Sequence, residues 1–229
     1  MADRIERGPD EPTDDTIKEL ADAFAEALLA GDEAAAEIAV REAMDAELSS
    51  AEIDELLIAP ALWLVGELWE RGKISVAQEH LATEISVRVL ALQREAQRVA
   101  QSRMGYRVML ATPTGELHVV ALRMVENLLR GAGYDVVMLG SDVPATALGD
   151  LAKLVSTDVV CMSLTMAGHR NEILSAIDNV RLAVPSAGFV VGGRGLTDEA
   201  HRRAQVQVCR RVSDVVEAVD AIVKRASLN

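Results

Sequence analysis

The residues with the clearest chemical potential are a carboxylate and a histidine two positions apart, Glu116 and His118. They stand in the segment 111–118 (Ala-Thr-Pro-Thr-Gly-Glu-Leu-His), between an apolar run that predicts a strand, Arg107–Leu110, and a run that predicts a helix, Val119–Arg130. A histidine placed there can direct one imidazole nitrogen outward while the acid orients the other, as in metal-ligating histidines. The pair therefore predicts a metal-cofactor site, although a lone histidine at the end of a strand is commonly structural.

The elements around this loop predict an open parallel sheet. From residue 107 onward, strand-like runs alternate with helix-like runs, which is typical of a doubly wound α/β domain. The predicted strands are Arg107–Leu110, Asp135–Leu139, Asp158–Leu164, Phe189–Val191 and Val206–Cys209. The predicted helices are Val119–Arg130, Ala145–Lys153, Asn171–Ala183, Thr197–Arg203 and Ser213–Arg225. Five such units match the flavodoxin-like (Rossmann-like) order, in which ligands bind outside the carboxyl ends of the strands.

Further polar and glycine residues fall at the same predicted edge. Hydroxyl groups there can bind a buried polar ligand, and adjacent glycines let a large flat group approach the backbone. A Gly-Gly pair after a strand is also an ordinary turn, and a histidine after the third strand can equally begin a solvent-facing helix. The residues are Ser141, Asp142 and Val143 after the second strand, Ser163, Thr165 and His169 around the end of the third, and Gly192 with Gly193 after the fourth.

The first part of the chain predicts helices alone. Four segments with short connections, Thr16–Ala30, Asp32–Glu47, Ser50–Arg71 and Ser75–Gln101, favour an antiparallel four-helix bundle. Glu52 supplies a partial capping signal after Ser49, and Pro60 should kink the third segment or split off its first turns. The expected domains are a disordered tail over 1–14, the bundle over 15–101 and, after a hinge at 101–106, the α/β domain over 106–229.

Composition excludes some classes of function. The 229 residues carry 36 acidic and 23 basic side chains, a net charge of −13, which argues against direct nucleic-acid binding. The N-terminus has no apolar leader, and no run is long and apolar enough to cross a membrane, so we expect a soluble, cytoplasmic protein. Cys161 and Cys209 lack metal-binding spacing and are expected to be reduced core thiols.

The α/β half resembles the cobalamin-binding fold. That family has an Asp-x-His-x-x-Gly loop, a Ser-x-(Leu/Thr) element and a Gly-Gly pair after the fourth strand, and its dimethylbenzimidazole tail lies in a slot between sheet and helices. The resemblance implies that His118 is the lower axial ligand of cobalt and that Gly115, Glu116 and Leu117 contact the cofactor. Two departures stand out: Glu116 replaces Asp, and Ala121 replaces Gly, which would narrow the slot.

The bundle carries a second motif, Trp69 followed by nine residues and then Glu79-His80. In isolation Trp69 is typical of a core residue and the polar pair of a solvated helix surface. Before a cobalamin-like domain, the string resembles the Trp-x9-Glu-His signature of the adenosylcobalamin-dependent photoreceptors related to CarH, whose bundle covers the upper face of the corrin. The resemblance implies that Trp69 and Val76 wall the adenosyl group and that Glu79 and His80 contact it. This subfamily also has Glu in its histidine loop.

The combined features predict a stand-alone cobalamin light sensor rather than an enzyme. It would signal through domain rearrangement, through self-association as a homo-oligomer such as a dimer, or through an unidentified protein partner. The family's DNA-binding domain is absent from the sequence, and Glu70 stands where the family can have a cobalt-capturing histidine, so the light product is left open. Such modules also resemble photocobilins, which pair cobalamin with a bilin such as biliverdin, although no bilin motif is present.

Two alternatives compete with the sensor. A corrinoid methyl carrier of a methyltransferase system would have the same fold and lower histidine, but predicts Asp and Gly in the loop and does not need the tryptophan signature. A scaffold that has lost its cofactor would have no need of the ligand, so the retention of His118 argues against it.

Overall fold

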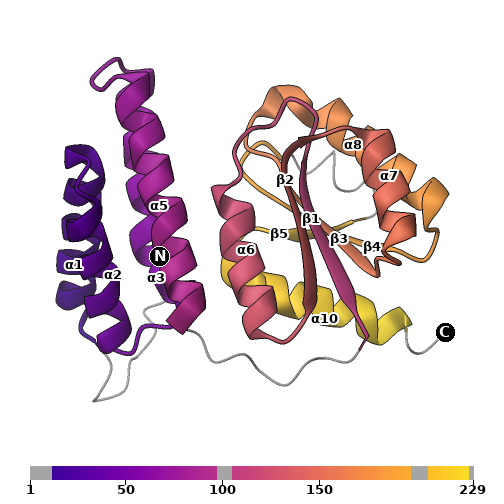
Figure 1. Cartoon of the computed structure of the whole chain (residues 1–229), viewed down its shortest axis with the longest axis horizontal. Helices are drawn as coiled ribbons and strands as arrows, with labels where there is room; N and C mark the ends of the chain where they lie inside the picture. The colour runs from indigo at the N-terminus through magenta and orange to yellow at the C-terminus, as the bar shows by residue number, and fades with distance from the viewer. Residues whose placement is uncertain (1–11, 97–104, 197–205, 227–229) are drawn as a thin grey trace, which may run out of the picture. The chain divides into compact units, whose positions relative to one another are not determined.

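The computed structural model describes residues 12–96, 105–196 and 206–226. It divides into two compact units, Met1–Ala96 and Gln97–Asn229, the first helical and the second built from a parallel sheet with helices (Figure 1). The predicted fold class, a helical bundle followed by a flavodoxin-like α/β domain, is confirmed. None of the helices in the described part of the chain combines the length and apolar composition that crossing a membrane requires.

The helical unit contains α1 (Asp14–Ala30), α2 (Glu33–Asp45), α3 (Ser50–Ile53), α4 (Ala59–Glu70) and α5 (Val76–Ala96). Side-chain caps set where these helices begin, because the first N–H groups of a helix have no partner inside it. Thr13 caps α1, which therefore starts two residues earlier than predicted, and Ser49 forms a complete capping box with Glu52. The rest of the predicted tail, residues 1–11, lies outside the described residues.

Pro60 does not end the third helical segment. The chain stays helical from Ser50 to Glu70, and the turn Asp54–Ile58 directly before the proline is π-helical. The N–H of Ala59 donates to the carbonyl of Asp54, five residues back, and the proline has no N–H to place in the ladder. The disruption predicted at Pro60 therefore takes the form of a π-helical turn.

The second unit has a five-stranded parallel sheet in the order β2-β1-β3-β4-β5. Its strands are β1 (Arg107–Pro113), β2 (Asp135–Val143), β3 (Val159–Ser163), β4 (Gly188–Gly192) and β5 (Gln207–Cys209). Helices α6 (Val120–Gly131) and α10 (Val215–Ala226) cover one face, and α7 (Ala145–Leu154) and α8 (Arg170–Ala183) cover the other (Figure 1). The predicted helix Thr197–Arg203 and most of the predicted hinge lie outside the described residues.

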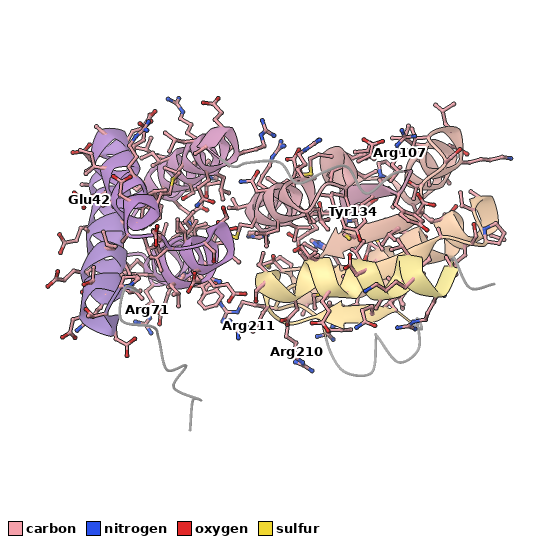
Figure 2. All side chains as sticks on the ribbon, turned by 90° about the horizontal axis from the view of Figure 1, so that it is seen from below. Glu42, Arg71, Arg107, Tyr134, Arg210 and Arg211 are labelled. Carbon is pink, nitrogen blue, oxygen red and sulfur yellow. The ribbon has the colours of Figure 1, made fainter. Side chains whose placement is uncertain are left out.

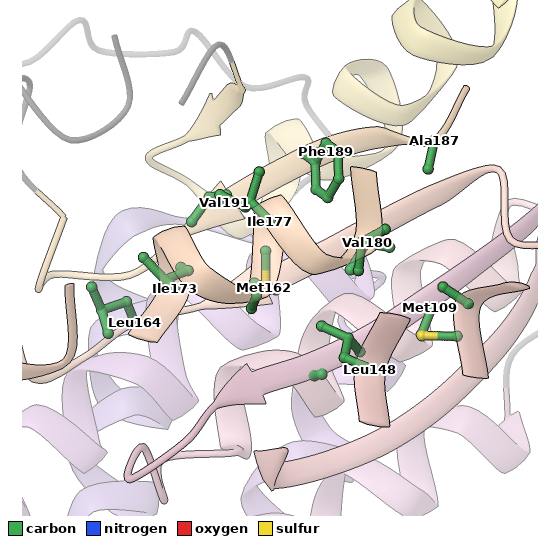
Figure 3. Close-up of a cluster of buried hydrophobic side chains, with 14 residues drawn as sticks. Met109, Leu148, Met162, Leu164, Ile173, Ile177, Val180, Ala187, Phe189 and Val191 are labelled. Carbon is green, nitrogen blue, oxygen red and sulfur yellow. The ribbon is translucent and has the colours of Figure 1, made fainter. Parts of the chain in front are cut away.

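Two apolar cores hold the helices on the sheet. The α7/α8 side is packed by aliphatic side chains and Phe189 (Figure 3), and burial of such side chains is the main stabilising term of the domain. On the α6/α10 side, the hydroxyl of the buried Tyr134 (Figure 2) hydrogen-bonds to Asp220 of α10. Cys161 and Cys209 are free thiols, the first buried and the second partly buried.

Strands β1 and β2 both run beyond their predicted ends, and this corrects the sequence prediction at the functional edge. Residues 111–113 continue β1, and residues 140–143, predicted as a loop, continue β2. The pairing register shifts twice over this stretch, where Gly140 and Asp142 have φ angles of 95° and 57°. Both positive φ angles lie within a bulged strand, so the Gly and Asp signals that indicated a turn belong to the sheet.

Candidate functional site

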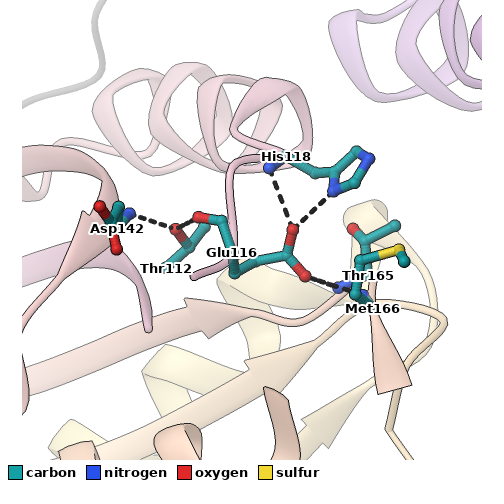
Figure 4. Close-up of polar contacts among 6 residues, drawn as sticks. All are labelled: Thr112, Glu116, His118, Asp142, Thr165 and Met166. Carbon is teal, nitrogen blue, oxygen red and sulfur yellow. Dashed lines mark hydrogen bonds and ion pairs between the residues drawn. The ribbon is translucent and has the colours of Figure 1, made fainter. Parts of the chain in front are cut away.

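The candidate site lies at the carboxyl end of β1, where the strand order reverses: β2 is added on one side of β1, and β3 and the later strands are added on the other. Strand β1 pairs with β2 on one side and with β3 on the other. Connections from β1 and β3 leave the sheet on opposite faces, so a crevice opens between them, and ligands of open α/β sheets bind there. The Glu116–His118 loop follows β1, and Thr165 with Met166 follows β3, so the two loops meet at this point (Figure 4).

Glu116 joins the two loops through both of its carboxylate oxygens. Its side chain is fully buried. Oε1 lies 2.5 Å from Nδ1 of His118 and accepts the backbone N–H of His118 at 3.0 Å. Oε2 accepts the backbone N–H groups of Thr165 and Met166, each at 2.8 Å (Figure 4). A single buried carboxylate thus fixes the imidazole to the end of the neighbouring strand.

The electrostatics of the pair keep the carboxylate ionised. Burial raises the pKa of Glu116, but the hydrogen bonds from Met166, from the His118 ring and backbone and from Thr165 outweigh it and hold the pKa below its ordinary value. An ionised acceptor at Oε1 places the ring proton of His118 on Nδ1, which leaves a lone pair on Nε2. The His118 side chain is 55% exposed, so this second nitrogen is available to a metal.

The ends of β3 and β4 provide polar and close-packed surfaces beside the loop. The Ser163 hydroxyl is buried and finds no hydrogen-bond partner among the described residues, so it is able to hydrogen-bond a polar group of a ligand. Gly193 has a φ of 102°, and a Cβ there would stand 2.3 Å from the carbonyl oxygen of Leu164. The chain's own backbone therefore requires glycine at 193. A Cβ on Gly192 would stand 3.2 Å from the carbonyl oxygen of Cys209.

The predicted residues of β2 lie beside the loop, and one of them binds it. A carboxylate oxygen of Asp142 accepts the N–H of Gly115 at 2.8 Å, so this side chain binds the histidine loop; its contact with a cofactor stays a prediction. Thr112, fully buried in β1, donates its hydroxyl to the carbonyl of Glu116. This role of Thr112 was not predicted, because it depends on the continuation of β1 beyond Leu110, its predicted end.

The remaining loop residues are distributed as follows. The Leu117 residue is 67% exposed, and Ser141 is exposed while Val143 is partly buried. His169, in a short 3-10 turn after β3, places its Nε2 3.0 Å from where a Cβ on Gly115 would be. His169 therefore packs against the histidine loop, and with a φ of 81° position 115 is restricted to glycine on two grounds.

In the helical unit, the four residues of the tryptophan motif lie at the adjoining ends of α4 and α5. Trp69 is in the last turn of α4 and is 45% exposed, and Val76, the first residue of α5, is 51% exposed. Glu79 and His80 follow Val76 at the three- and four-residue spacing that shares a helix face. Nδ1 of His80 is 2.5 Å from a carboxylate oxygen of Glu79, whose other oxygen accepts the hydroxyl of Thr83.

The fold and the site together define a class of protein. The α/β domain has a carboxylate-oriented histidine at its switch point and a buried hydroxyl without a partner at the end of the next strand, and a helical unit precedes it in the sequence. These features suit a large metal-containing cofactor. Two family models described as B12 binding domain match the chain, one over residues 20–92 and the other over residues 106–222. The second match spans just over half of the chain, and the protein belongs to the B12-binding domain family: it is a cobalamin-binding module.

Its relatives include both transcriptional repressors and corrinoid proteins. The chain is 31% identical to the HTH-type transcriptional repressor CarH of Myxococcus xanthus over 84% of its own length and 63% of the repressor, and 31% identical to CarA over 70% and 54%. It is 29% identical to dimethylamine corrinoid protein 1 of Methanosarcina acetivorans, over 59% of its own length and 66% of that protein. The chain thus spans between half and two thirds of the length of the two repressors.

Among solved structures, the fold matches the monomethylamine corrinoid protein of Methanosarcina barkeri. The TM-score is 0.74 at 17% identity, over 88% of this chain and 97% of that protein. At this level of identity the match concerns the fold alone, and it agrees with the helical unit and parallel sheet described above.

Proposed function

We propose that the protein is an adenosylcobalamin-binding light-sensing module, a sensor rather than an enzyme. The observation that carries the proposal is the exposed tryptophan motif of the helical unit, in which Trp69 and Val76 leave apolar surface uncovered beside the Glu79–His80 pair. Exposed apolar groups rimmed by polar ones mark a binding surface. The 31% identity to CarH over most of the chain supports the same assignment.

In the α/β domain, the residues of the histidine loop and its neighbours would hold the cofactor. His118 offers Nε2 to cobalt, Glu116 holds the ring proton on Nδ1, and the Ser163 hydroxyl supplies a hydrogen bond to the cofactor's tail. Gly192, which pairs with Ser163 between β3 and β4, would lie beside that tail. When bound, adenosylcobalamin supplies a cobalt–carbon bond that visible light breaks.

In the helical unit, the tryptophan motif would hold the adenosyl group. Trp69 and Val76 would pack against it, and Glu79 and His80 would hydrogen-bond to it. Losing a buried group removes these contacts and changes the relative free energies of the unit's packing states, which is what a population shift requires. We propose that the change is transmitted by self-association of the chain, as a dimer, or by a protein partner.

A second candidate function is a corrinoid methyl carrier. It is favoured by the 29% identity to dimethylamine corrinoid protein 1. A carrier has no need of an adenosyl pocket, so substitutions at Trp69 or Glu79 would leave cofactor binding unchanged. Glu116 in the place of Asp and Ala121 in the place of Gly in the loop favour the sensor.

The experiment that separates these functions is reconstitution in the dark with adenosylcobalamin or with methylcobalamin, followed by absorption spectra before and after green light. We expect tighter binding of adenosylcobalamin and a light-state spectrum that differs from that of the free cofactor. Trp69→Ala should weaken binding of adenosylcobalamin but not of methylcobalamin. The matched control Trp63→Ala, at another exposed tryptophan of α4, should weaken neither.

Three results would overturn the sensor assignment. They are failure to bind, equal affinity for the two cobalamins, and photolysis identical to that of the free cofactor. Measuring molecular mass in dark and light tests the proposed dimer, and adding biliverdin to the reconstitution tests the second chromophore.

A further inference from the structure

The β2 strand reaches the histidine loop through two bulges that sit opposite it. Leu110 of β1 pairs with Met138, Ala111 pairs with Gly140, and Pro113 pairs with Val143, so β2 gains one residue at each shift. The extra residues are accommodated by positive φ angles at Gly140 and Asp142. For Asp142, at 57°, this conformation is uncommon and persists only where the surroundings impose it.

The second bulge hydrogen-bonds to Thr112 of β1 and to Gly115 and Glu116 of the loop. The N–H of Asp142 points at both the Thr112 hydroxyl and the Glu116 carbonyl, each at 3.1 Å, and its carboxylate accepts the N–H of Gly115 at 2.8 Å. The Thr112 hydroxyl donates in turn to the carbonyl of Glu116 (Figure 4). The bonds that end at Gly115 and at Glu116 lie within three residues of His118, and Thr112 links them to β1.

The loop itself is a tight turn that these bonds complete. The N–H of Glu116 donates to the carbonyl of Pro113 at 3.0 Å, and Gly115 occupies the third position of the turn with a φ of 81°. A type II turn needs a positive φ at that position. The N–H of Gly115 takes no part in closing the turn, and the Asp142 carboxylate is its acceptor.

We propose that Asp142, with Thr112, is a positioning residue that holds the Glu116–His118 turn in its ligand-donating conformation before the cofactor arrives. This inference rests on the proposed cobalamin function and assigns Asp142 to the loop and not to the cofactor. Asp142 of β2 and Thr112 of β1 together form what we call the clamp. The clamp and the Glu116 carboxylate both hold the loop that carries the axial histidine. Its consequence is a larger fraction of bound cofactor ligated by histidine.

Substitutions at position 142 separate the two parts of the clamp. Asp142→Gly accepts the positive φ but has no acceptor, Asp142→Asn tolerates the φ and keeps a side-chain oxygen, and Asp142→Ala lacks both properties. Asp150→Asn, at an exposed aspartate of α7, is the matched control for loss of charge. The first readout is the hydrogen-exchange rate of the Gly115 amide in the cofactor-free protein. The second is the fraction of bound cob(II)alamin ligated by a nitrogen-15 labelled histidine, measured by EPR.

We expect Asp142→Gly to speed exchange of the Gly115 amide by about tenfold, the change expected for one lost hydrogen bond, and to lower the histidine-ligated fraction. Asp142→Ala should speed exchange further and lower the ligated fraction further, while Asp142→Asn and Asp150→Asn stay near wild type. Unchanged exchange in Asp142→Gly would overturn the clamp, and a lower histidine-ligated fraction with unchanged exchange would instead assign Asp142 to the cofactor. Wild-type protein that binds no cobalamin would remove the proposed function, and the exchange rates would then decide on the clamp alone.

Discussion

Replacing Glu116 by glutamine tests the central polar contact of the site. The fully buried carboxylate faces four donors, two on each oxygen: the ring and backbone N–H of His118 on Oε1, and the backbone N–H groups of Thr165 and Met166 on Oε2. A glutamine side chain has one acceptor oxygen and one NH2 group. In either orientation, the NH2 group faces two donors.

The cost follows from which pair of donors is left without an acceptor. With the amide oxygen toward Thr165 and Met166, the ring of His118 can accept a hydrogen bond from the NH2 group. The backbone N–H of His118, itself a donor, is left facing that NH2 group without an acceptor. One buried donor without a partner costs about 1–3 kcal/mol, and this is the destabilisation we expect for Glu116→Gln. The same arrangement moves the ring proton to Nε2, so the nitrogen that faces outward loses its lone pair and the variant should lose histidine ligation.

The effect of this substitution should depend on pH. The pKa of Glu116 is lower in the folded protein than its ordinary value of 4.5, so the carboxylate stabilises the fold above that pH. This contribution is lost as the pH falls through the folded-state pKa. The free-energy difference between wild type and Glu116→Gln should therefore be largest at neutral pH and shrink in acid.

Urea unfolding of the two proteins between neutral and acidic pH measures this difference. Glu116→Asp is the control, because it keeps a carboxylate and restores the residue expected from the methyl-carrier pattern. Equal unfolding midpoints at neutral pH, or a difference that does not change with pH, would refute the assigned role of the buried carboxylate.

Three further predictions concern other parts of the chain. Burial raises the pKa of Asp54 from 3.8 to about 7. The free energy of unfolding should therefore fall by up to about 4 kcal/mol as pH rises through that window, and urea unfolding should find this dependence missing in Asp54→Asn. Gly193→Ala forces a Cβ to 2.3 Å from a backbone oxygen at a φ of 102° and should lower the free energy of unfolding in urea by about 2–4 kcal/mol. Gly66→Ala, where a Cβ would meet nothing within 4 Å, should raise it by about 0.5–1 kcal/mol. Equal unfolding midpoints for the two variants would contradict the packing argument. Glu70→His places an imidazole after the signature tryptophan, and the absorption spectrum of its light state should be that of a bis-imidazole cobalamin, so a spectrum like the wild type's would contradict the upper-face assignment.

Much of the fold was predictable because two simple periodicities carry it. Alternating apolar strands and amphipathic helices indicated the parallel sheet, and capping residues such as Ser49 with Glu52 marked where helices begin. The ends of β1 and β2 were predicted wrongly. Gly140 and Asp142 are typical of turns, but here their positive φ angles accommodate bulges inside a strand, and such pairing depends on a neighbour that local sequence does not show.

The site was predictable where one side chain acts on a close neighbour. The two-residue spacing of Glu116 and His118 predicted their contact, which the structure contains. The backbone donors of Thr165 and Met166 could not be predicted, because they come from a loop about fifty residues away and have no side-chain signature. Asp142 was recognised as a site residue, but its partner, the Gly115 N–H, depends on the bulge register.

The most direct test of the account is EPR of cob(II)alamin bound to protein in which histidine carries nitrogen-15. We expect a doublet superhyperfine splitting in wild type from a single labelled histidine nitrogen on cobalt, and loss of that doublet in His118→Ala but not in His80→Ala or His169→Ala. A triplet from the cofactor's own unlabelled base in wild type, or a doublet that persists in His118→Ala, would contradict the assignment of His118 as the lower axial ligand.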